Sequence, residues 1–283
     1  MNIKPQYNKA LQQTQYKTAQ NLNARIRLHQ RYSTSSQTWD EFVFSQMHLK
    51  TGQNVLELGC GNASQTRSNR ALFPRDIHYF MTDFSWGMMQ EAITALNADP
   101  RFAFSVQDAQ AVAFPLQSFD LVTANHMLYH VPDILLALKG IWRLLKPNGR
   151  LMAATNGSGH MADLDSLIAA YNPAFQNMHA FHTAFTLENG KDLIASIFGS
   201  CTLVPYHSDL WVTSAKDLTD YVLSMDKMNG TARSMDPQSL TAFFQSCIDK
   251  EGGIKIRKST GLLMAIKEET GRPILADKPQ KQQ

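Results

Sequence analysis

The chain has 283 residues, of which 43% are hydrophobic and 18% are charged, and its formal net charge is +3. This composition is typical of a globular protein that can bury a sizeable core. No apolar run approaches the roughly 18–20 residues of a membrane-spanning helix, and the polar residues 1–20 do not resemble a secretory signal. The three cysteines lie far apart in the sequence, which predicts reduced thiols and a cytoplasmic protein.

Residues 1–50 are predicted to form an N-terminal helical segment. Thr38 and Glu41 have the spacing of a capping box, and apolar residues follow at helical intervals. The segment holds seven basic and two acidic residues, a local excess of five positive charges. Two interpretations of this excess are open: a solvated helix face, or a surface that meets an anionic substrate or RNA.

From residue 54 onward, short apolar runs alternate with helical patterns. The runs end at polar residues or at glycine and predict strands at 54–58, 77–82, 102–106, 119–124 and 150–155. A helix is predicted from Asp133 to the Pro147–Gly149 stretch. This alternation predicts an α/β fold with a doubly wound, mostly parallel sheet at residues 51–156.

Beyond Asn156 the alternation becomes less regular. Helices are expected within 160–200, at 215–228 and at 237–250, and strands at 201–213 and 254–266. Residues 157–269 are therefore predicted to form the substrate side and the end of the sheet. Residues 270–283 read as a disordered tail.

The stretch from Asn54 to Asn62 indicates a nucleotide-type pocket. A buried strand ends in Gly59 and Gly61, and glycine at a strand end lets a ligand approach the main chain closely. A dinucleotide fingerprint requires a third glycine, where this chain has Ser64, and no phosphate-binding Gly-Lys-Ser or Gly-Lys-Thr occurs.

Acidic residues mark three of the predicted strands: Glu57, Asp83 and Asp108. Carboxylates repel phosphate but suit a ligand with hydroxyl groups, amines and a positive centre. Asp83 follows Gly59 at about the distance at which an acid reaches a ribose diol. The pattern therefore points to S-adenosylmethionine.

Six motifs in order give the chain a specific resemblance. They are Val55-Leu-Glu-Leu-Gly-Cys-Gly61, Asp83-Phe-Ser-Trp-Gly-Met88, Asp108-Ala109, Phe114-Pro115 with Ser118-Phe119-Asp120, Asn125-His-Met-Leu-Tyr-His-Val-Pro-Asp133 and Leu145-Lys-Pro-Asn-Gly149. Over residues 50–156 the chain resembles the class I S-adenosylmethionine-dependent methyltransferases of the small-molecule type, which includes quinone-biosynthesis enzymes. The resemblance implies a seven-stranded Rossmann-like sheet with an antiparallel last strand. The stretches 201–213 and 254–266 would supply its last two strands, with the helices between them inserted over the active site.

The resemblance also implies which residues bind the cofactor: Glu57, Gly59, Cys60, Gly61, Asp83, Phe84, Met88, Asp108, Ala109 and Asn125. The glycine loop would face the methionine moiety, with Glu57 beneath it. Asp83 would accept hydrogen bonds from the ribose hydroxyls, and Phe84 and Met88 would lie against the adenine. Asp108 would face the adenine amino group and Ala109 the ring edge. Asn125 would lie where the methyl group emerges.

Each of these residues also has a purely structural interpretation. Asp83 could cap the following helix, Asp108 could cap a turn, and Glu57 could support the loop from behind. His126 and His130 have a spacing seen in zinc sites, but Met127 occupies the place of the glutamate in H-E-x-x-H, so no metal is predicted.

The expected reaction is in-line transfer of the methyl group to an oxygen, nitrogen or carbon atom of a small molecule. His126 is the candidate general base, and residues 1–25, including Arg25, are expected to close over the cofactor as a lid.

An RNA or other nucleic-acid methyltransferase is the alternative function, although the chain lacks an Asn-Pro-Pro-Tyr or Asp-Pro-Pro-Tyr run. A non-catalytic cofactor-binding partner protein is another. Aromatic residues of the second half could line the acceptor pocket or the core: Tyr171, Phe175, Phe181, Phe185, Tyr206, Trp211 and Tyr221.

Overall fold

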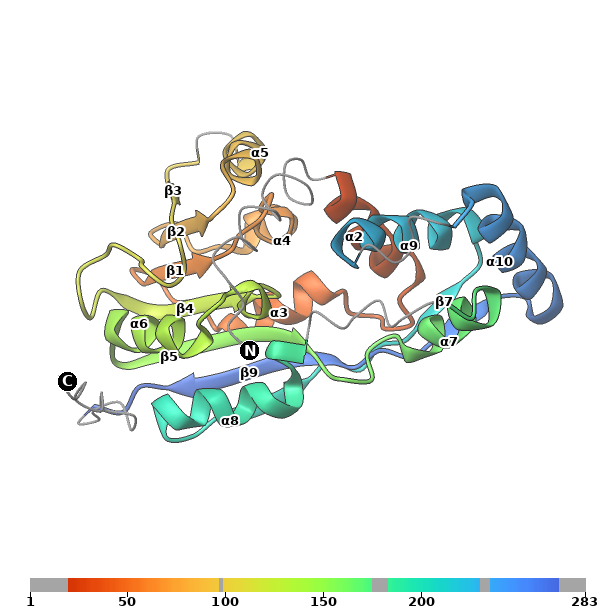
Figure 1. Cartoon of the computed structure of the whole chain (residues 1–283). Coiled ribbons are helices and arrows are strands. Elements are labelled where there is room, and N and C mark those ends of the chain that lie inside the picture. The colour runs from red at the N-terminus through yellow and green to blue at the C-terminus, as the bar shows by residue number, and fades with distance from the viewer. Residues whose placement is uncertain (1–19, 97–98, 175–182, 230–234, 270–283) are drawn as a thin grey trace.

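The computed structural model describes residues 20–96, 99–174, 183–229 and 235–269, so the first residues of the predicted lid and the predicted tail lie outside it. Seven strands form the main sheet in the order β3-β2-β1-β4-β5-β9-β6 (Figure 1). The strands are β1 Asn54–Leu58, β2 His78–Asp83, β3 Phe102–Val106, β4 Phe119–Asn125, β5 Leu145–Asn156, β6 Thr202–Pro205 and β9 Thr260–Ile266. The first five pair in parallel, whereas β9 runs antiparallel to both β5 and β6. The predicted Rossmann-like sheet with an antiparallel last strand is confirmed.

Helices cover both faces of this sheet. They are α3 Trp39–Met47, α4 Ser64–Ser68, α5 Trp86–Leu96, α6 Ile134–Leu144 and α8 Leu187–Phe198, with short 3-10 turns at Arg70–Leu72 and Leu128–His130. The predicted capping box of α3 is present, because Thr38 and Glu41 exchange both of its hydrogen bonds. Asp133 caps α6 by accepting from the Leu136 amide at 2.8 Å. No helix within the described ranges is both long and apolar enough to cross a membrane.

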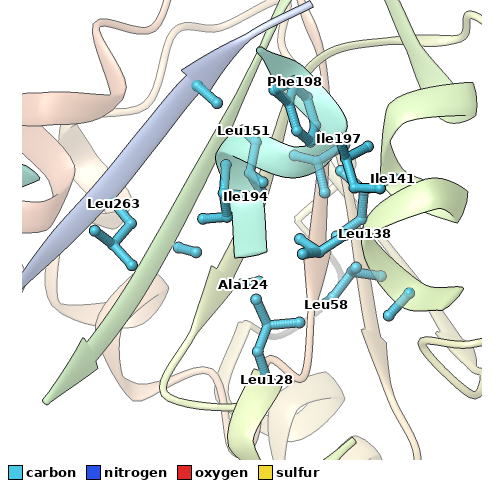
Figure 2. Close-up of a cluster of buried hydrophobic side chains, with 14 of the residues drawn as sticks. Leu58, Ala124, Leu128, Leu138, Ile141, Leu151, Ile194, Ile197, Phe198 and Leu263 are labelled. Carbon is cyan, nitrogen blue, oxygen red and sulfur yellow. The ribbon is translucent and has the colours of Figure 1, made fainter. Parts of the chain in front are cut away.

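The strands are apolar on both faces, which gives the sheet two separate cores. Along β5, Leu151 and Ala153 pack on one side, and Met152 and Ala154 on the other. Figure 2 shows the first side, where α6 and α8 bring their apolar side chains onto the sheet through Leu138, Ile141, Ile194, Ile197 and Phe198. α3 and α5 cover the opposite side. Double coverage explains why these strands read as apolar runs rather than as alternating patterns.

Two predicted strands are each divided in two, which corrects their boundaries. The run 201–213 forms β6 and a separate β7, Leu210–Val212, while 254–266 forms β8, Ile254–Ile256, and β9. β7 and β8 pair with each other as a second, two-stranded sheet. The polar stretches 206–209 and 257–259 interrupt the apolar runs at the points where the chain passes from one sheet to the other.

The helix before β5 also ends earlier than predicted. It stops at Leu144 rather than at Pro147, and Leu145 already pairs with Phe119 of β4. Proline cannot donate a backbone hydrogen bond within a helix, so the chain has to leave the helix before Pro147.

A third hydrophobic cluster lies beside the sheet and is called the cap here. It combines β7 and β8 with α2 Gln20–Tyr32, α7 Ala162–Tyr171, α9 Ala215–Asn229 and α10 Pro237–Glu251. Figure 1 shows these helices grouped at one end of the molecule. The two N-terminal helices therefore separate: Leu28 of α2 is buried in the cap, whereas Val43 of α3 is buried against the sheet.

Candidate functional site

A cavity of about 450 Å³ lies between the carboxyl ends of the parallel strands and the cap. Every residue predicted from the sequence to contact the cofactor lines it, and so does His126. The location follows from the fold, because the carboxyl ends of parallel strands meet at one edge of a sheet. Its volume falls within the range of small-molecule sites, roughly 300–1,000 Å³.

The glycine loop after β1 follows a strongly curved path. Gly59 and Gly61 have φ angles of 67° and 57°, in the left-handed region that favours glycine. A Cβ atom on Gly59 would lie 2.8 Å from Cβ of Met127, so the position is closed to side chains as well. Ala63 takes a φ of 57° without being glycine. The left-handed conformation costs a residue with a side chain about 1–2 kcal/mol, and the loop adopts it at Ala63 nonetheless.

Asp83 holds the glycine loop at the end of β2. Its carboxylate accepts hydrogen bonds from the amides of Gly61 at 2.9 Å and Ser85 at 2.8 Å. The helix-cap interpretation of Asp83 is wrong, because the hydroxyl of Ser85 accepts from the amide of Met88 in the first turn of α5. Burial raises the pKa of Asp83, while the amide bonds from Ser85 and Gly61 favour the carboxylate. The aspartate therefore connects the loop to β2 with both oxygens in use.

Glu57 and Asp108 make local contacts in addition to lining the cavity. Glu57 is buried and accepts from the hydroxyl of Thr66 at 3.2 Å, which joins β1 to α4 beneath the loop. Desolvation raises the pKa of Glu57 to about 7. Asp108 accepts from the amide of Gln110 at 2.9 Å and so stabilises the turn after β3. The supporting roles considered for both residues are therefore present in the structure.

His126 follows β4 in an unusual backbone conformation. Its φ is 53°, and its amide donates to the carbonyl of Ala154 at 3.0 Å. Left-handed backbone in a residue other than glycine is costly and is concentrated at functional sites. The imidazole lies 5.2 Å from the Trp39 ring, centroid to centroid. Desolvation, aided by the positive charge of Lys258, lowers the pKa of His126 to about 4, so the ring is neutral at neutral pH.

The rest of the cavity lining consists of residues that were not predicted as site residues, although Arg25 was expected in the lid. They come from α2, α3 and α9, from the loop between β5 and α7 and from the loop after β8: Leu22, Arg25, Ile26, His29, Trp39, His160, Met225 and Lys258. Among them, the His29 ring lies 6.1 Å from the His160 ring and 5.8 Å from the Tyr221 ring, centroid to centroid. These segments are far apart in the sequence and carry no motif, so only the tertiary fold brings them together.

The structure sorts the aromatic residues proposed for the acceptor pocket. Tyr206 and Tyr221 line the cavity, whereas Phe185 is buried in the sheet core. Tyr171 packs on Phe243 within the cap. Trp211 is 43% exposed at the surface of the short sheet, and Phe175 and Phe181 lie outside the described residues.

Much of the basic charge of α2 is neutralised inside the molecule. Arg31 pairs with Asp217 of α9 at 2.9 Å, and Arg27 pairs with Asp220 at 3.2 Å. Arg25 instead lines the cavity. The pairing of Arg27 and Arg31 thus weakens the interpretation of α2 as an RNA-binding surface. Across the described part of the chain, no group of three or more His, Cys, Asp or Glu side chains is arranged to hold a metal ion.

Comparison with known proteins supports a methyltransferase domain at the sheet. Residues 56–153 match a family model described as a methyltransferase domain. Demethylmenaquinone methyltransferase of Staphylococcus haemolyticus is 32% identical over 114 residues, which cover 40% of this chain and 48% of that protein. Phosphoethanolamine N-methyltransferase 2 of Caenorhabditis elegans is 30% identical over 114 residues, covering 40% of this chain and 26% of that protein. The match thus spans about half or less of the length of these relatives.

Similarity to solved structures extends further along the chain. Phosphoethanolamine N-methyltransferase 2 of Haemonchus contortus, in complex with phosphomonomethylethanolamine and S-adenosylhomocysteine, superimposes with a TM-score of 0.56 at 18% identity. It covers 93% of this chain and 60% of that one. The YcgJ protein of Bacillus subtilis gives a TM-score of 0.55 at 16% identity, covering 81% of this chain and 98% of that one. Residues 56–153 thus match a methyltransferase domain, and they lie within a Rossmann-like sheet.

Proposed function

We propose that the protein transfers the methyl group of S-adenosylmethionine to a small-molecule acceptor. The observation that carries this proposal is the single cavity in which the glycine loop and Asp83 occupy one end and a wall from the cap forms the other. The names of its relatives, which methylate demethylmenaquinone or phosphoethanolamine, support a small-molecule acceptor.

The donor groups of the cavity fit this cofactor. Asp83 and Asp108 give the cofactor end acidic groups, and Glu57 adds a negative charge once it ionises near pH 7, so this end attracts a sulfonium ion and disfavours phosphate. The Asp83 carboxylate accepts backbone hydrogen bonds from Gly61, Ser85 and Phe84, and a carboxylate offers about four acceptor sites, so some capacity remains for the ribose hydroxyls. Phe84, 38% exposed, and Met88 flank the position expected for adenine.

S-adenosylmethionine, held by the glycine loop and Asp83, would supply an electrophilic methyl group to a lone pair of the acceptor, and the electrons of the broken carbon–sulfur bond would stay on sulfur. The protein's part is therefore to align the acceptor and to exclude water, and alignment can contribute about 7–11 kcal/mol. α2 provides cover, because Leu22 lies against Gly61 of the glycine loop and Ile26 also lines the cavity.

His126 is proposed to touch the acceptor at the methyl end of the cavity. With a pKa of about 4 the neutral imidazole can accept a hydrogen bond, but it is a weak base. Its principal role is then to orient the acceptor, and it takes a proton only from an acceptor that is already acidic.

Two variants of His126 separate orientation from proton transfer. His126→Ala is expected to lower turnover at least about tenfold, a loss of about 1.4 kcal/mol, with normal cofactor affinity. His126→Asn tolerates the left-handed backbone and keeps a hydrogen-bonding group, so it should retain most of the turnover. Equal losses in both variants would favour proton transfer, and unchanged turnover in both would remove His126 from the mechanism.

The cofactor assignment itself is tested by calorimetric titration with S-adenosylmethionine and S-adenosylhomocysteine. Asp83→Asn should weaken both at least about tenfold, because hydrogen bonds to a charged acceptor are worth about 1.5–3 kcal/mol. Asp76→Asn, on an exposed loop, makes the same charge change and serves as the control. Equal affinities in the wild type and in Asp83→Asn would refute the site.

A further inference from the structure

Lys258 brings a positive charge into the cavity from a distant part of the chain. It lies in the loop between β8 and β9, partly buried, and its side chain lines the cavity. Its ammonium is 5.3 Å from the centroid of the Tyr206 ring, and its nearest hydrogen-bond partner is the Ser208 hydroxyl at 3.5 Å. Both are weak partners for a charge that has lost part of its water.

The carboxylate of Asp209 is a nearby negative charge that favours the charged form of Lys258, but its direct contacts are with other groups. It accepts from the backbone amide of Lys258 at 3.2 Å and lies 3.6 Å from the ammonium of Lys255. Within the described residues, no carboxylate lies at ion-pair distance from the Lys258 ammonium. Buried or half-buried charges are normally paired, so the arrangement lacks an anion on the cavity side.

Lys258 stands at the methyl end of the cavity rather than at the adenine end. Its charge acts on the imidazole of His126, which the sequence places directly after Asn125. The Trp39 ring lies 5.2 Å from His126 and 5.3 Å from Tyr206, so these rings form a continuous wall from Lys258 to His126. Arg25, also lining the cavity, adds a second positive charge on the α2 side.

The cavity is therefore polarised. Glu57, Asp83 and Asp108 line the end proposed for the cofactor, whereas Lys258 brings a positive charge to the side of His126. A sulfonium ion suits the first end and an anion suits the second. An anionic acceptor would also be drawn toward the positive sulfur next to which it has to bind.

We propose that the methyl acceptor carries a carboxylate or phosphate group that pairs with the Lys258 ammonium, while the Trp39–Tyr206 wall contacts the apolar part of the same molecule. The proposal deepens the methyltransferase function and rests on it. Lys258 is then a specificity-determining residue, contributed by the segment that closes the sheet.

The test uses three ring-matched probes on protein saturated with S-adenosylhomocysteine: benzoate, phenyl phosphate and the neutral benzamide. Calorimetry or ligand-detected NMR should show at least one anion binding about tenfold more tightly than benzamide. The preferred anion then tells a carboxylate site from a phosphate site. Lys258→Met should abolish the preference and Lys258→Arg should keep it, because the charge is retained.

Lys250→Met, which removes an exposed charge from α10, is the matched control and should leave the preference unchanged. Equal binding of all three probes, no binding of either anion, or an anion preference that survives Lys258→Met would each overturn the proposal. Running the probes also without S-adenosylhomocysteine keeps the two proposals apart. Failure to bind S-adenosylhomocysteine counts against the methyltransferase, whereas loss of the anion preference alone counts against the Lys258 site.

Discussion

The sheet edge and the cap contribute to the same cavity but are encoded differently. The sheet edge takes its site residues from consecutive strand–turn–helix units within residues 54–131, each ending in its own polar signal. The cap is assembled from α2, α7, α9, α10 and a two-stranded sheet whose members are distant in the sequence. The site residues of the sheet edge can be recognised from local sequence patterns, whereas those of the cap can be recognised only in the folded structure.

This division has a functional counterpart. The local motifs hold groups suited to one cofactor, while the dispersed segments hold Arg25, His29, Tyr221 and Lys258, which line the rest of the cavity. A cap built from insertions and an N-terminal helix can change its lining without disturbing the strand ends. Substitutions on either side should consequently separate cofactor binding from acceptor selection.

The largest effect is expected at the glycine loop. Gly59→Ala places a Cβ atom 2.8 Å from Cβ of Met127 at a φ of 67°. Strain and overpacking together should cost about 3 kcal/mol in the free energy of unfolding and disrupt cofactor binding. Gly52→Ala is the matched control, because its φ is 76° but nothing lies within 4 Å of the added atom. Urea denaturation of both variants checks this, and equal losses would mean that the contact with Met127 is unimportant.

A smaller effect is expected from Glu57 and depends on pH. Its folded pKa is raised to about 7 from 4.5, so its contribution is fully favourable below pH 4.5 and is lost as the pH rises through about 7. Between pH 5 and pH 7.5 the wild type should lose about 2 kcal/mol from this group, whereas Glu57→Gln should not. Parallel stability curves of the two proteins over this range would show that the carboxyl group titrates normally.

The smallest of the three effects concerns the attachment of α2 to the cap. Asp217 is buried on α9 and accepts from Arg31 at 2.9 Å and from the Tyr32 hydroxyl at 2.7 Å. Because Arg31 is 61% exposed, Asp217→Asn should lower the free energy of unfolding by only about 1–2 kcal/mol, which is measured as a lower melting temperature. Asp220→Asn, a more exposed partner of Arg27, should cost less. A reversed order of the two melting temperatures would contradict this placement of α2.

The site residues of the sheet edge could be predicted from the sequence, whereas those of the cap could not. The glycines, Asp83 and Asp108 could be located because each comes at the end of an apolar run, and such ends meet at one sheet edge. Ala63 could not be foreseen, since alanine gives no sign of a left-handed turn. Lys258 could not be found either, because a single lysine among polar loop residues has no distinguishing pattern until β7 and β8 pair and carry it to the cavity.

The central claim is that one cavity holds the cofactor at the strand ends and the acceptor under the cap. A crystal structure of the protein with S-adenosylhomocysteine tests it most directly. The ribose hydroxyls should contact Asp83, the adenine should lie near Phe84 and Met88, and the sulfur should face Asn125 and His126, with the space toward Lys258 left for the acceptor. An adenine placed against His29 and Tyr221, or a ligand bound outside the cavity, would contradict the assignment.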